Sequence, residues 1–316
     1  KSRARGRRIG DGASPAARAD AVANRRRGVD ADAHRFARKA AAMSALPALF
    51  LSHGAPTLPL EDRPASRFLA ALGREFCGAL GAPRAIVIIS AHYETQGAEV
   101  SLAARPQTIH DFRGFPVALN AMRHPAAGDP ALAQDVAERL RRAGIAVRTH
   151  PSRGLDHGAW TPLVLIDPDA AIPVVSLSIS PGHDAAWHFA MGRALAPLRD
   201  DGVLIIGSGA ATHNLSAFFS GGFAIDDEAP VARDFADALA RALEGGDWDA
   251  VLRGPDGLDG GRFNHPSDDH ITPLYVAMGA GGPGAGARRI HASTNYGVIA
   301  MDAYAFGGPE TAALAL

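Results

Sequence analysis

The stretch AIVIISAH at residues 85–92 decides the fold: an apolar run closes on a serine and is followed by a histidine. A run this short, rich in β-branched residues and apolar at consecutive positions, is typical of a strand covered on both faces. Similar runs occur at residues 48–52 (ALFLS), 172–180 (IPVVSLSIS) and 203–207 (VLIIG). These runs predict four buried strands.

Amphipathic helix patterns separate the strand runs, at residues 66–80, 129–144, 185–199 and 230–243. In the second of them, Asp129 is a good N-cap, Pro130 suits the first helical position and Gly144 is a stop signal. Strands that alternate with helices predict an α/β fold, a single domain with a central, mostly parallel or mixed sheet flanked by helices.

Composition and charge narrow the class of protein. The 316 residues hold 32 basic and 33 acidic side chains, so no overall field favours nucleic acid or a membrane surface. No apolar run reaches the roughly 20 residues of a membrane span. The single cysteine, Cys77, excludes an internal disulfide framework and favours a reducing compartment, which predicts a cytoplasmic protein.

The N-terminal segment differs from the rest of the chain. Residues 1–42 contain 12 Lys or Arg and four Asp, with few residues that could pack in a core. We interpret residues 1–42 as a disordered or non-native basic leader, with a targeting or nucleic-acid-binding arm as the alternative. Residues 43–316 are then the folded catalytic domain. The sequence does not determine its oligomeric state, and a homo-oligomer is possible.

Three histidines follow predicted strands: His53 directly after residues 48–52, His92 two residues after 85–90, and His213 just beyond 203–207. Ligands of open α/β sheets bind beyond the carboxyl ends of the strands. If these strands are parallel neighbours, the three imidazoles converge there. Because Zn²⁺, Fe²⁺ and Cu²⁺ accept imidazole nitrogen readily, the pattern predicts a site for a divalent ion.

Two further histidines compete for a fourth place in this site. Asp268 and Asp269 are expected to form the cap and first turn of a helix, which puts His270 at a helix start, where it can face a cleft. His265 precedes Pro266, which favours extended backbone, and we rank it second.

Two histidines are candidates for contact with a substrate. His157 in GLDHGAW lies between Gly154 and Gly158, which allow the backbone to approach another group closely. A substrate-binding or supporting role competes there with a structural one. His110 lies in TIHDFRGFP, a loop rich in aromatic residues and glycine, and is a candidate for a substrate pocket. The other histidines, at 34, 124, 150, 183, 188 and 291, are expected to be solvated or to pack.

Other chemistries are poorly supported. The sequence has neither G-x-S-x-G nor H-E-x-x-H. Ser208 follows a strand but lacks the elbow that would expose a nucleophile, and GSGAATH at 207–213 lacks the third glycine and the lysine of a phosphate-binding loop. A hydrolase would need an acidic base beside its ligands, for which Glu94 is the candidate, although a solvated role suits it better.

Taken together and in order, seven motifs resemble those of the DODA-type class III extradiol ring-opening dioxygenases: LFLSHGAP, IVIISAHYET, TIHDFRGFP, GLDHGAWTPL, IPVVSLSIS, GSGAATHNL and HPSDDHITPLYVAMGA. The resemblance extends from about Leu46 to the terminal AYAFGG. It implies an oxidoreductase that inserts O₂ into a catechol-type ring and opens it, with a small aromatic diol as substrate and no nucleic-acid or membrane partner.

The resemblance also implies roles for individual residues. His53, His92 and His270 match metal ligands, while His213 matches the catalytic acid/base, which is sometimes described as a further ligand. His157 matches a catalytic and substrate-binding residue. His110 matches a residue that lines the substrate pocket. The implied cofactor is one divalent ion per chain, Fe²⁺ or Zn²⁺.

Two alternatives remain open at this point, a Memo-like binding protein with the same fold and a zinc-dependent hydrolase. Retention of His213 and of TIHDFRGFP favours the dioxygenase, since a binding scaffold needs neither. One departure from the family pattern concerns substrate: Asn120 and His124 stand where tyrosines are common. If these two positions contact the substrate, the ring substituents that are accepted are expected to differ.

Overall fold

The computed structural model describes residues 45–77, 81–309, 311 and 314. The basic segment 1–42 and its boundary lie outside the described residues, as do the side chain of Cys77 and the last three residues of the helix predicted at 66–80. Among the helices of the described part, none combines the length and the apolar character that crossing a membrane requires.

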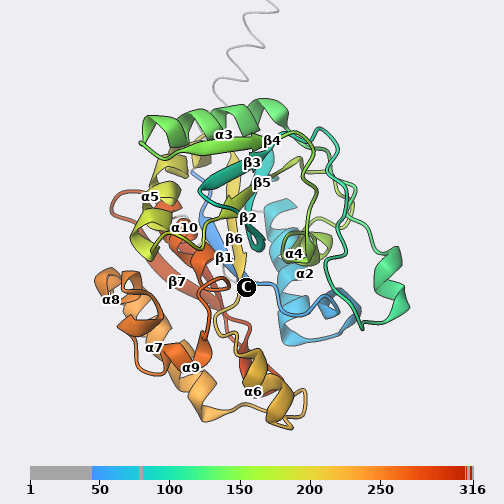
Figure 1. Cartoon of the computed structure of the whole chain (residues 1–316), viewed down its shortest axis with the longest axis vertical. Helices are drawn as coiled ribbons and strands as arrows, with labels where there is room; N and C mark the ends of the chain where they lie inside the picture. Colours follow the sequence, from blue (N-terminus) through green and yellow to red (C-terminus); the bar gives the residue numbers. More distant parts are fainter. Residues whose placement is uncertain (1–44, 78–80, 310, 312–313, 315–316) are drawn as a thin grey trace, which may run out of the picture. The chain divides into compact units, whose positions relative to one another are not determined.

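Eight strands of the described chain form one sheet, in the order β4-β3-β5-β2-β6-β1-β10-β7, and two short strands form a separate pair (Figure 1). The strands are β1 Ala48–Ser52, β2 Ala85–Glu94, β3 Ala98–Ser101, β4 Val147–His150, β5 Val174–Ile179, β6 Val203–Gly209, β7 Gly286–His291, β8 Thr294–Asn295, β9 Ile299–Ala300 and β10 Ala303–Gly307.

The four strands predicted from apolar runs form the centre of this sheet. β5, β2, β6 and β1 pair in parallel, so their carboxyl ends meet at one edge. The outer strands make the sheet mixed: β10 runs antiparallel to β1, and β3 runs antiparallel to β5. The prediction of a mostly parallel or mixed central sheet is confirmed.

Both faces of the central strands are buried, and alternate residues belong to two separate hydrophobic clusters. In β2, Ile86 and Ile88 pack in one cluster, while Val87 and Ile89 pack in the other. The period of two between faces explains why the run had to be apolar at every position.

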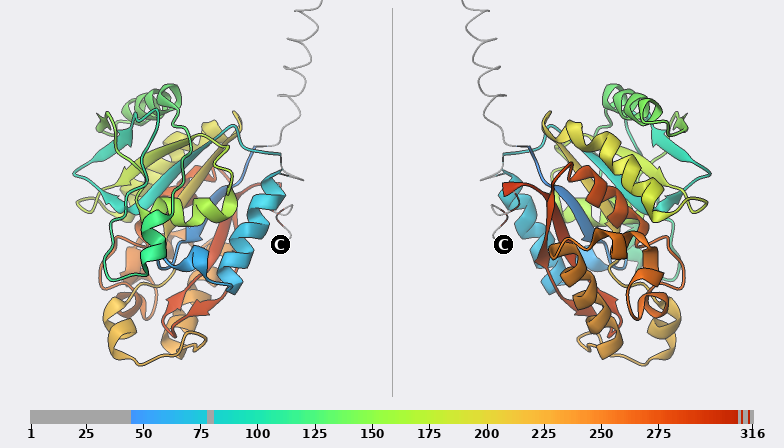
Figure 2. Two further views of the ribbon diagram at one scale, coloured as in Figure 1. Left: turned by 90° about the vertical axis from the view of Figure 1, so that its right-hand side faces the viewer. Right: turned by 90° about the vertical axis from the view of Figure 1, so that its left-hand side faces the viewer.

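Helices cover each face of the sheet (Figures 1 and 2). One cluster contains side chains of α3, α5, α7 and α10, and the other contains side chains of α2 and α4. The α-helices are α2 Pro64–Cys77, α3 Pro130–Arg142, α4 His157–Ile166, α5 Ala185–Leu195, α6 Leu215–Ser220, α7 Pro230–Glu244, α8 Trp248–Leu252, α9 Gly261–Asn264 and α10 Thr272–Ala280. Short 3₁₀ turns lie at Leu58–Leu60, Val117–Ala121, Ala196–Arg199 and Gly254–Gly257.

The local signals hold at α3, where Asp129 is the N-cap and its side chain accepts a hydrogen bond from the Leu132 amide. The helix predicted at 185–199 instead ends at Leu195 and continues as a 3₁₀ turn. Pro197 lies in that turn and has no N–H for the helical pattern.

Two predictions near the site are wrong in detail. β2 continues to Glu94, so His92 lies inside the strand rather than after it. The helix after His270 begins at Thr272, with Pro273 in its first turn, so Asp268 and Asp269 are not its cap and first turn. Proline is favoured at that position because its missing N–H would have no helical partner there. His270 therefore lies in the loop that precedes α10.

Candidate metal centre and active site

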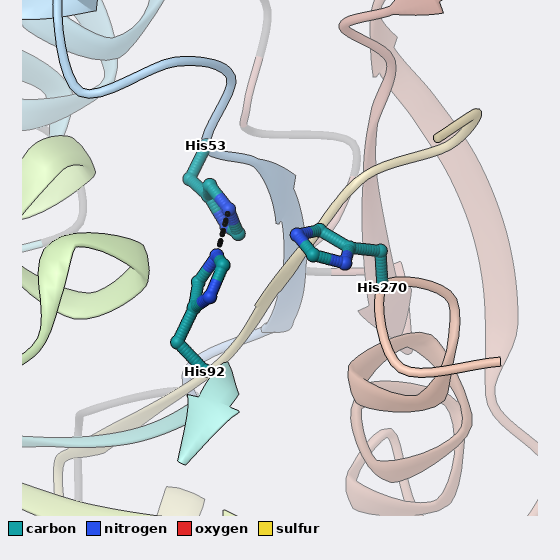
Figure 3. A group of neighbouring side chains, drawn as sticks. All are labelled: His53, His92 and His270. Carbon is teal, nitrogen blue, oxygen red and sulfur yellow. Dashed lines mark hydrogen bonds between the residues drawn. The ribbon is translucent and has the colours of Figure 1, made fainter. Parts of the chain in front are cut away.

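Three histidines converge at the carboxyl edge of the sheet (Figure 3). One ring nitrogen from each of His53, His92 and His270 lies within 4.8 Å of the other two. The His53 Nε2 and His92 Nε2 atoms are 3.2 Å apart. Two of the three histidines whose convergence the sequence predicted, His53 and His92, are in this group. Its third member is His270, and His213 is not in it.

Strand order and one glycine place these rings. His53 follows β1, and its amide donates to the Gly209 carbonyl at the end of β6, the strand between β1 and β2. A Cβ atom at Gly209 would lie 2.0 Å from the His270 carbonyl oxygen. Only glycine at 209 lets the loop before α10 come this close to β6, which brings His270 to the ends of β1 and β2.

The three rings are poorly exposed to solvent: His53 is 1% exposed and His270 is 3% exposed. Burial, with repulsion from His92 and the other neighbouring rings, lowers the pKa of His53 well below its ordinary value. Burial, with repulsion from His157, lowers the pKa of His92 to about 2. Both rings are therefore neutral at pH 7, which is the state that offers a lone pair to a metal ion.

The spacing of these nitrogens fits a common metal ligand set. Two imidazole nitrogens bound to one ion at the usual 2.0–2.1 Å lie roughly 3.0–3.4 Å apart. The 3.2 Å between His53 Nε2 and His92 Nε2 falls in that range. Three imidazole ligands suit Fe²⁺ or Zn²⁺ better than Mg²⁺ or Ca²⁺, which prefer oxygen ligands.

A carboxylate stands behind one member of the trio. The Asp269 Oδ2 atom lies 2.7 Å from His270 Nδ1. Burial opposes ionisation of Asp269, but the hydrogen bond and charge of His270 outweigh it and lower the pKa of the carboxyl. Such a carboxylate fixes the orientation of a metal-binding histidine and increases its basicity.

His157 lies on the His92 side of the trio, with the two ring centroids 3.9 Å apart. It is the first residue of α4, whose N-cap Asp156 accepts a hydrogen bond from the Ala159 amide. The Asp111 Oδ1 atom accepts a hydrogen bond from the His157 backbone amide. The same oxygen lies 3.0 Å from His157 Nδ1, but this ring nitrogen makes no hydrogen bond of good geometry with it.

Gly158 explains why the sequence has a glycine beside His157. A Cβ atom there would lie 2.8 Å from His92 Cδ2 and 2.4 Å from Ser90 Oγ. The prediction that glycine permits a close approach at this point is confirmed.

His213 lies on the opposite side, where its ring stacks on that of His270. Its backbone amide donates to the Asn264 carbonyl. His213 has a ring nitrogen within 4.8 Å of ligand atoms of Asp269 and His270, but it is not in the group with His53 and His92. Burial, with repulsion from His270, lowers the pKa of His213 to about 3.

His265, the rival of His270, is fully buried away from the trio. Its Nε2 atom is 2.8 Å from the Ala211 carbonyl oxygen and its ring contacts Phe235, so it supports the loop that leads to His213. Of the two candidates, the structure brings His270 to the group. Burial lowers the pKa of His265 to about 4.

His110 lies near the site but outside the trio. Its Nε2 atom is 3.1 Å from the Met122 carbonyl oxygen, and its ring contacts Phe112 and Trp160. Phe112 in turn contacts His157 edge to face, with centroids 5.9 Å apart. Phe112 thus contacts both His110 and His157, and Trp160 packs against Phe112 and His110.

Sequence reasoning missed Asp111, Asp269 and Ser208 as partners of the histidines. The Ser208 Oγ atom lies 3.1 Å from His53 Nδ1. The two aspartates directly follow His110 and directly precede His270, which was a usable signal. Ser208 gave no such signal as a lone residue, because its contact joins positions 155 residues apart.

Comparison with known families and proteins agrees with this geometry. Residues 45–307 match the family described as the catalytic LigB subunit of aromatic ring-opening dioxygenase. The chain belongs to this LigB family. LigB dioxygenases depend on a metal, and the histidine trio is one of three groups of side chains in the described chain that could hold one. The other two groups are His92, Asp111 and His157, and His213, Asp269 and His270.

Individual LigB relatives cover most of the chain. A 4,5-DOPA dioxygenase extradiol of Beta vulgaris is 40% identical over 259 residues, which is 81% of this chain and 95% of the relative. A 4,5-DOPA dioxygenase extradiol of Escherichia coli K12 is 41% identical over 242 residues, which is 74% of this chain and 85% of the relative. The crystal structure of an uncharacterized E. coli K12 protein has a TM-score of 0.67 and 32% identity, and it covers 83% of this chain and 100% of that one.

These relatives confirm the resemblance to DODA-type extradiol dioxygenases. The chain is an extradiol ring-cleavage dioxygenase, an oxidoreductase that acts on an aromatic substrate with O₂. The binding-protein and hydrolase alternatives are not supported. Glu94, the candidate base of a hydrolase, is exposed at the end of β2.

Proposed function

We propose that this chain opens the ring of a catechol beside its two hydroxyl groups, with one Fe²⁺ held by His53, His92 and His270. The observation that carries the proposal is the group of three imidazoles, whose nitrogens lie within 4.8 Å of one another, from the residue after β1, from β2 and from the loop before α10. Three protein ligands leave coordination positions open for the diol and for dioxygen.

The metal chemistry is the reason for choosing iron. A redox-active ion held by these three histidines would supply the path for electrons between an aromatic diol and dioxygen. Zn²⁺ has no redox chemistry and would bind the same nitrogens without supporting this reaction.

His213 is the proposed proton acceptor and donor. Its ring is half-buried and neutral, so it can take a proton from a hydroxyl group of the diol. An anionic diol beside the ring would raise the pKa of His213 from about 3 toward the working pH. The same ring can later return the proton to an oxygen of the opening product.

His157 is proposed to hydrogen bond to the substrate from the other side of the trio, as a second catalytic residue. The Asp111 carboxylate next to it and the N-cap of α4 fix its position. Phe112, which packs against the buried Trp160, offers an apolar face for the aromatic ring beside His157, and His110 is proposed to line the pocket beyond it.

The first substrate to test is DOPA, because the relatives at 38–41% identity are named 4,5-DOPA dioxygenase extradiol. The expected product is a ring-opened semialdehyde of the muconic type, which absorbs visible light as a yellow chromophore. We include in the proposal that the ring of DOPA is cleaved between carbons 4 and 5, as the name of those relatives states.

The test is anaerobic loading with Fe²⁺, followed by air and a panel of catechols that begins with DOPA. Yellow product should form with the wild type and vanish, together with bound iron, in His53→Ala. His150→Gln, on the edge strand β4, is the matched histidine control and should retain both. A wild-type protein with full iron occupancy that turns over no catechol would refute the proposal, as would equal activity of the zinc-loaded form.

A further inference from the structure

Each of the four central parallel strands carries a buried serine at or near its carboxyl end. These are Ser178 in β5, Ser90 in β2, Ser208 in β6 and Ser52 in β1, all between 0% and 3% exposed. Ser178, Ser90 and Ser208 are partners on one rung of the sheet. A hydroxyl buried at this depth is costly unless it is hydrogen-bonded, so its partners indicate its role.

The hydroxyl of Ser208 has two partners. It donates to the carbonyl oxygen of Gly158, in the first turn of α4. Its oxygen also lies 3.1 Å from Nδ1 of His53. A carbonyl can only accept, and a serine has one hydroxyl proton, so Ser208 must accept from His53. The proton of the neutral His53 ring is therefore on Nδ1.

This proton placement sets the chemistry of His53. With the proton on Nδ1, the lone pair of the ring is on Nε2, the atom that faces His92 Nε2 at 3.2 Å. That is the tautomer a metal ligand needs at this position. The opposite tautomer would point an N–H bond into the space between the two rings.

Ser90 makes a parallel connection one strand away. Its hydroxyl donates to the Asp156 carboxylate at 2.6 Å, and its oxygen accepts from the backbone amide of His92 at 3.1 Å. Asp156 is the N-cap of α4. The two serines thus join the strand ends that bear His53 and His92 to the first turn of α4, which bears His157.

We propose that Ser208 is a positioning residue that holds His53 in the Nδ1–H tautomer and so sets the affinity of the trio for its ion. The proposal rests on the proposed role of His53 as a ligand. Ser178 provides a matched control, because it lies on the same rung but bonds to Thr95 Oγ1 and the Glu99 amide instead of reaching a histidine.

The first measurement compares Ser208→Ala with Ser178→Ala for binding of Co²⁺, followed by its visible absorption, and for Zn²⁺ in competition with a chelator. Loss of an outer partner of a ligand histidine typically lowers metal affinity about 10–100-fold, and this is expected for Ser208→Ala. Ser178→Ala should bind like the wild type, and Ser208→Thr, which keeps a hydroxyl, should recover much of the affinity. Equal affinity of the two alanine variants would overturn the proposal.

The second measurement uses the wild-type protein, so it does not depend on whether a Ser208 variant folds. Nitrogen-15 spectra of the wild-type, metal-free protein report the tautomer of each neutral histidine, and the signals of His53 are those missing in His53→Gln. A proton on Nδ1 supports the proposal, and a proton on Nε2 refutes it. Because neither measurement uses a catechol, a protein that passes both yet opens no ring refutes the proposed function alone.

Discussion

The ring of His213 lies face to face with the ring of His270, with centroids 3.4 Å apart and planes inclined by 10°. The two rings differ in their position in the histidine cluster, and the sequence alone did not show this difference. His270 belongs to the trio with His53 and His92, and His213 lies against the outside of that trio.

His213→Gln should therefore keep the ion and lose turnover. Loss of an acid/base residue typically costs about 10²–10⁴-fold in rate, and this is expected in kcat with bound iron unchanged. The measurement is iron content beside steady-state turnover of the same preparation. If iron is lost in proportion to activity, His213 is a ligand as well.

Gly158→Ala should disrupt the centre from outside it. The new Cβ atom would meet Ser90 Oγ at 2.4 Å and His92 Cδ2 at 2.8 Å, so α4 or the ring of His92 must move. Overpacking of this kind costs about 1–3 kcal/mol, and weaker metal binding should accompany the lower stability.

The matched control for this variant is Gly182→Ala, where a Cβ atom would meet no atom within 4 Å and φ is not positive. Thermal melts and metal titrations of the two variants should differ clearly. Wild-type behaviour of Gly158→Ala in both measurements would contradict the close approach at His92.

Asp269→Asn should weaken metal binding without removing a ligand. The carboxylate accepts from His270 Nδ1 at 2.7 Å, and an amide in its place is a poorer acceptor that also stabilises the ligand less. Affinity should fall about 10–100-fold in a chelator competition. Asp268→Asn is the control, since that carboxylate pairs with the exposed Arg262, and it should bind metal normally.

The metal-free protein should lose stability on mild acidification. Burial lowers the pKa of His92 to about 2 and of His213 to about 3, against 6.5 in the unfolded chain. Below pH 6.5 the unfolded chain binds more protons than the folded one. The contribution of each ring is thus complete above 6.5 and is lost as the pH falls toward the folded pKa, by about 1.4 kcal/mol per pH unit.

Thermal melts in the presence of a chelator test this dependence. Tm should be nearly constant from about pH 7 upward and should fall between pH 6.5 and 5. The same melts with bound Zn²⁺ should show a higher Tm near pH 7, because an ion that binds the folded state stabilises it. A Tm that stays level or rises down to pH 5 would mean that these rings are not held neutral.

The sequence by itself determined the central sheet and the histidines worth following. Runs such as 85–90 are apolar at every position because both faces of the strand are buried, and this pattern is visible locally. Helix α3 was likewise fixed by Asp129 and Pro130, whose effects act within one turn. His53 and His92 were found because both come at the end of an apolar run, although β2 itself continues past His92 to Glu94.

Only the tertiary structure decided how these residues are used. His270, rather than His213, completes the trio because the loop before α10 packs on Gly209, a contact between positions that no local pattern links. The partners Asp111 and Ser208 were unseen for the same reason, because they contact histidines that are 46 and 155 residues away. Asp269, in contrast, is adjacent to its partner His270. Apolar runs indicate burial, which is a property averaged over many residues. Binding of a metal depends instead on the position of single side chains to within about an ångström. Packing across the whole sheet sets that position.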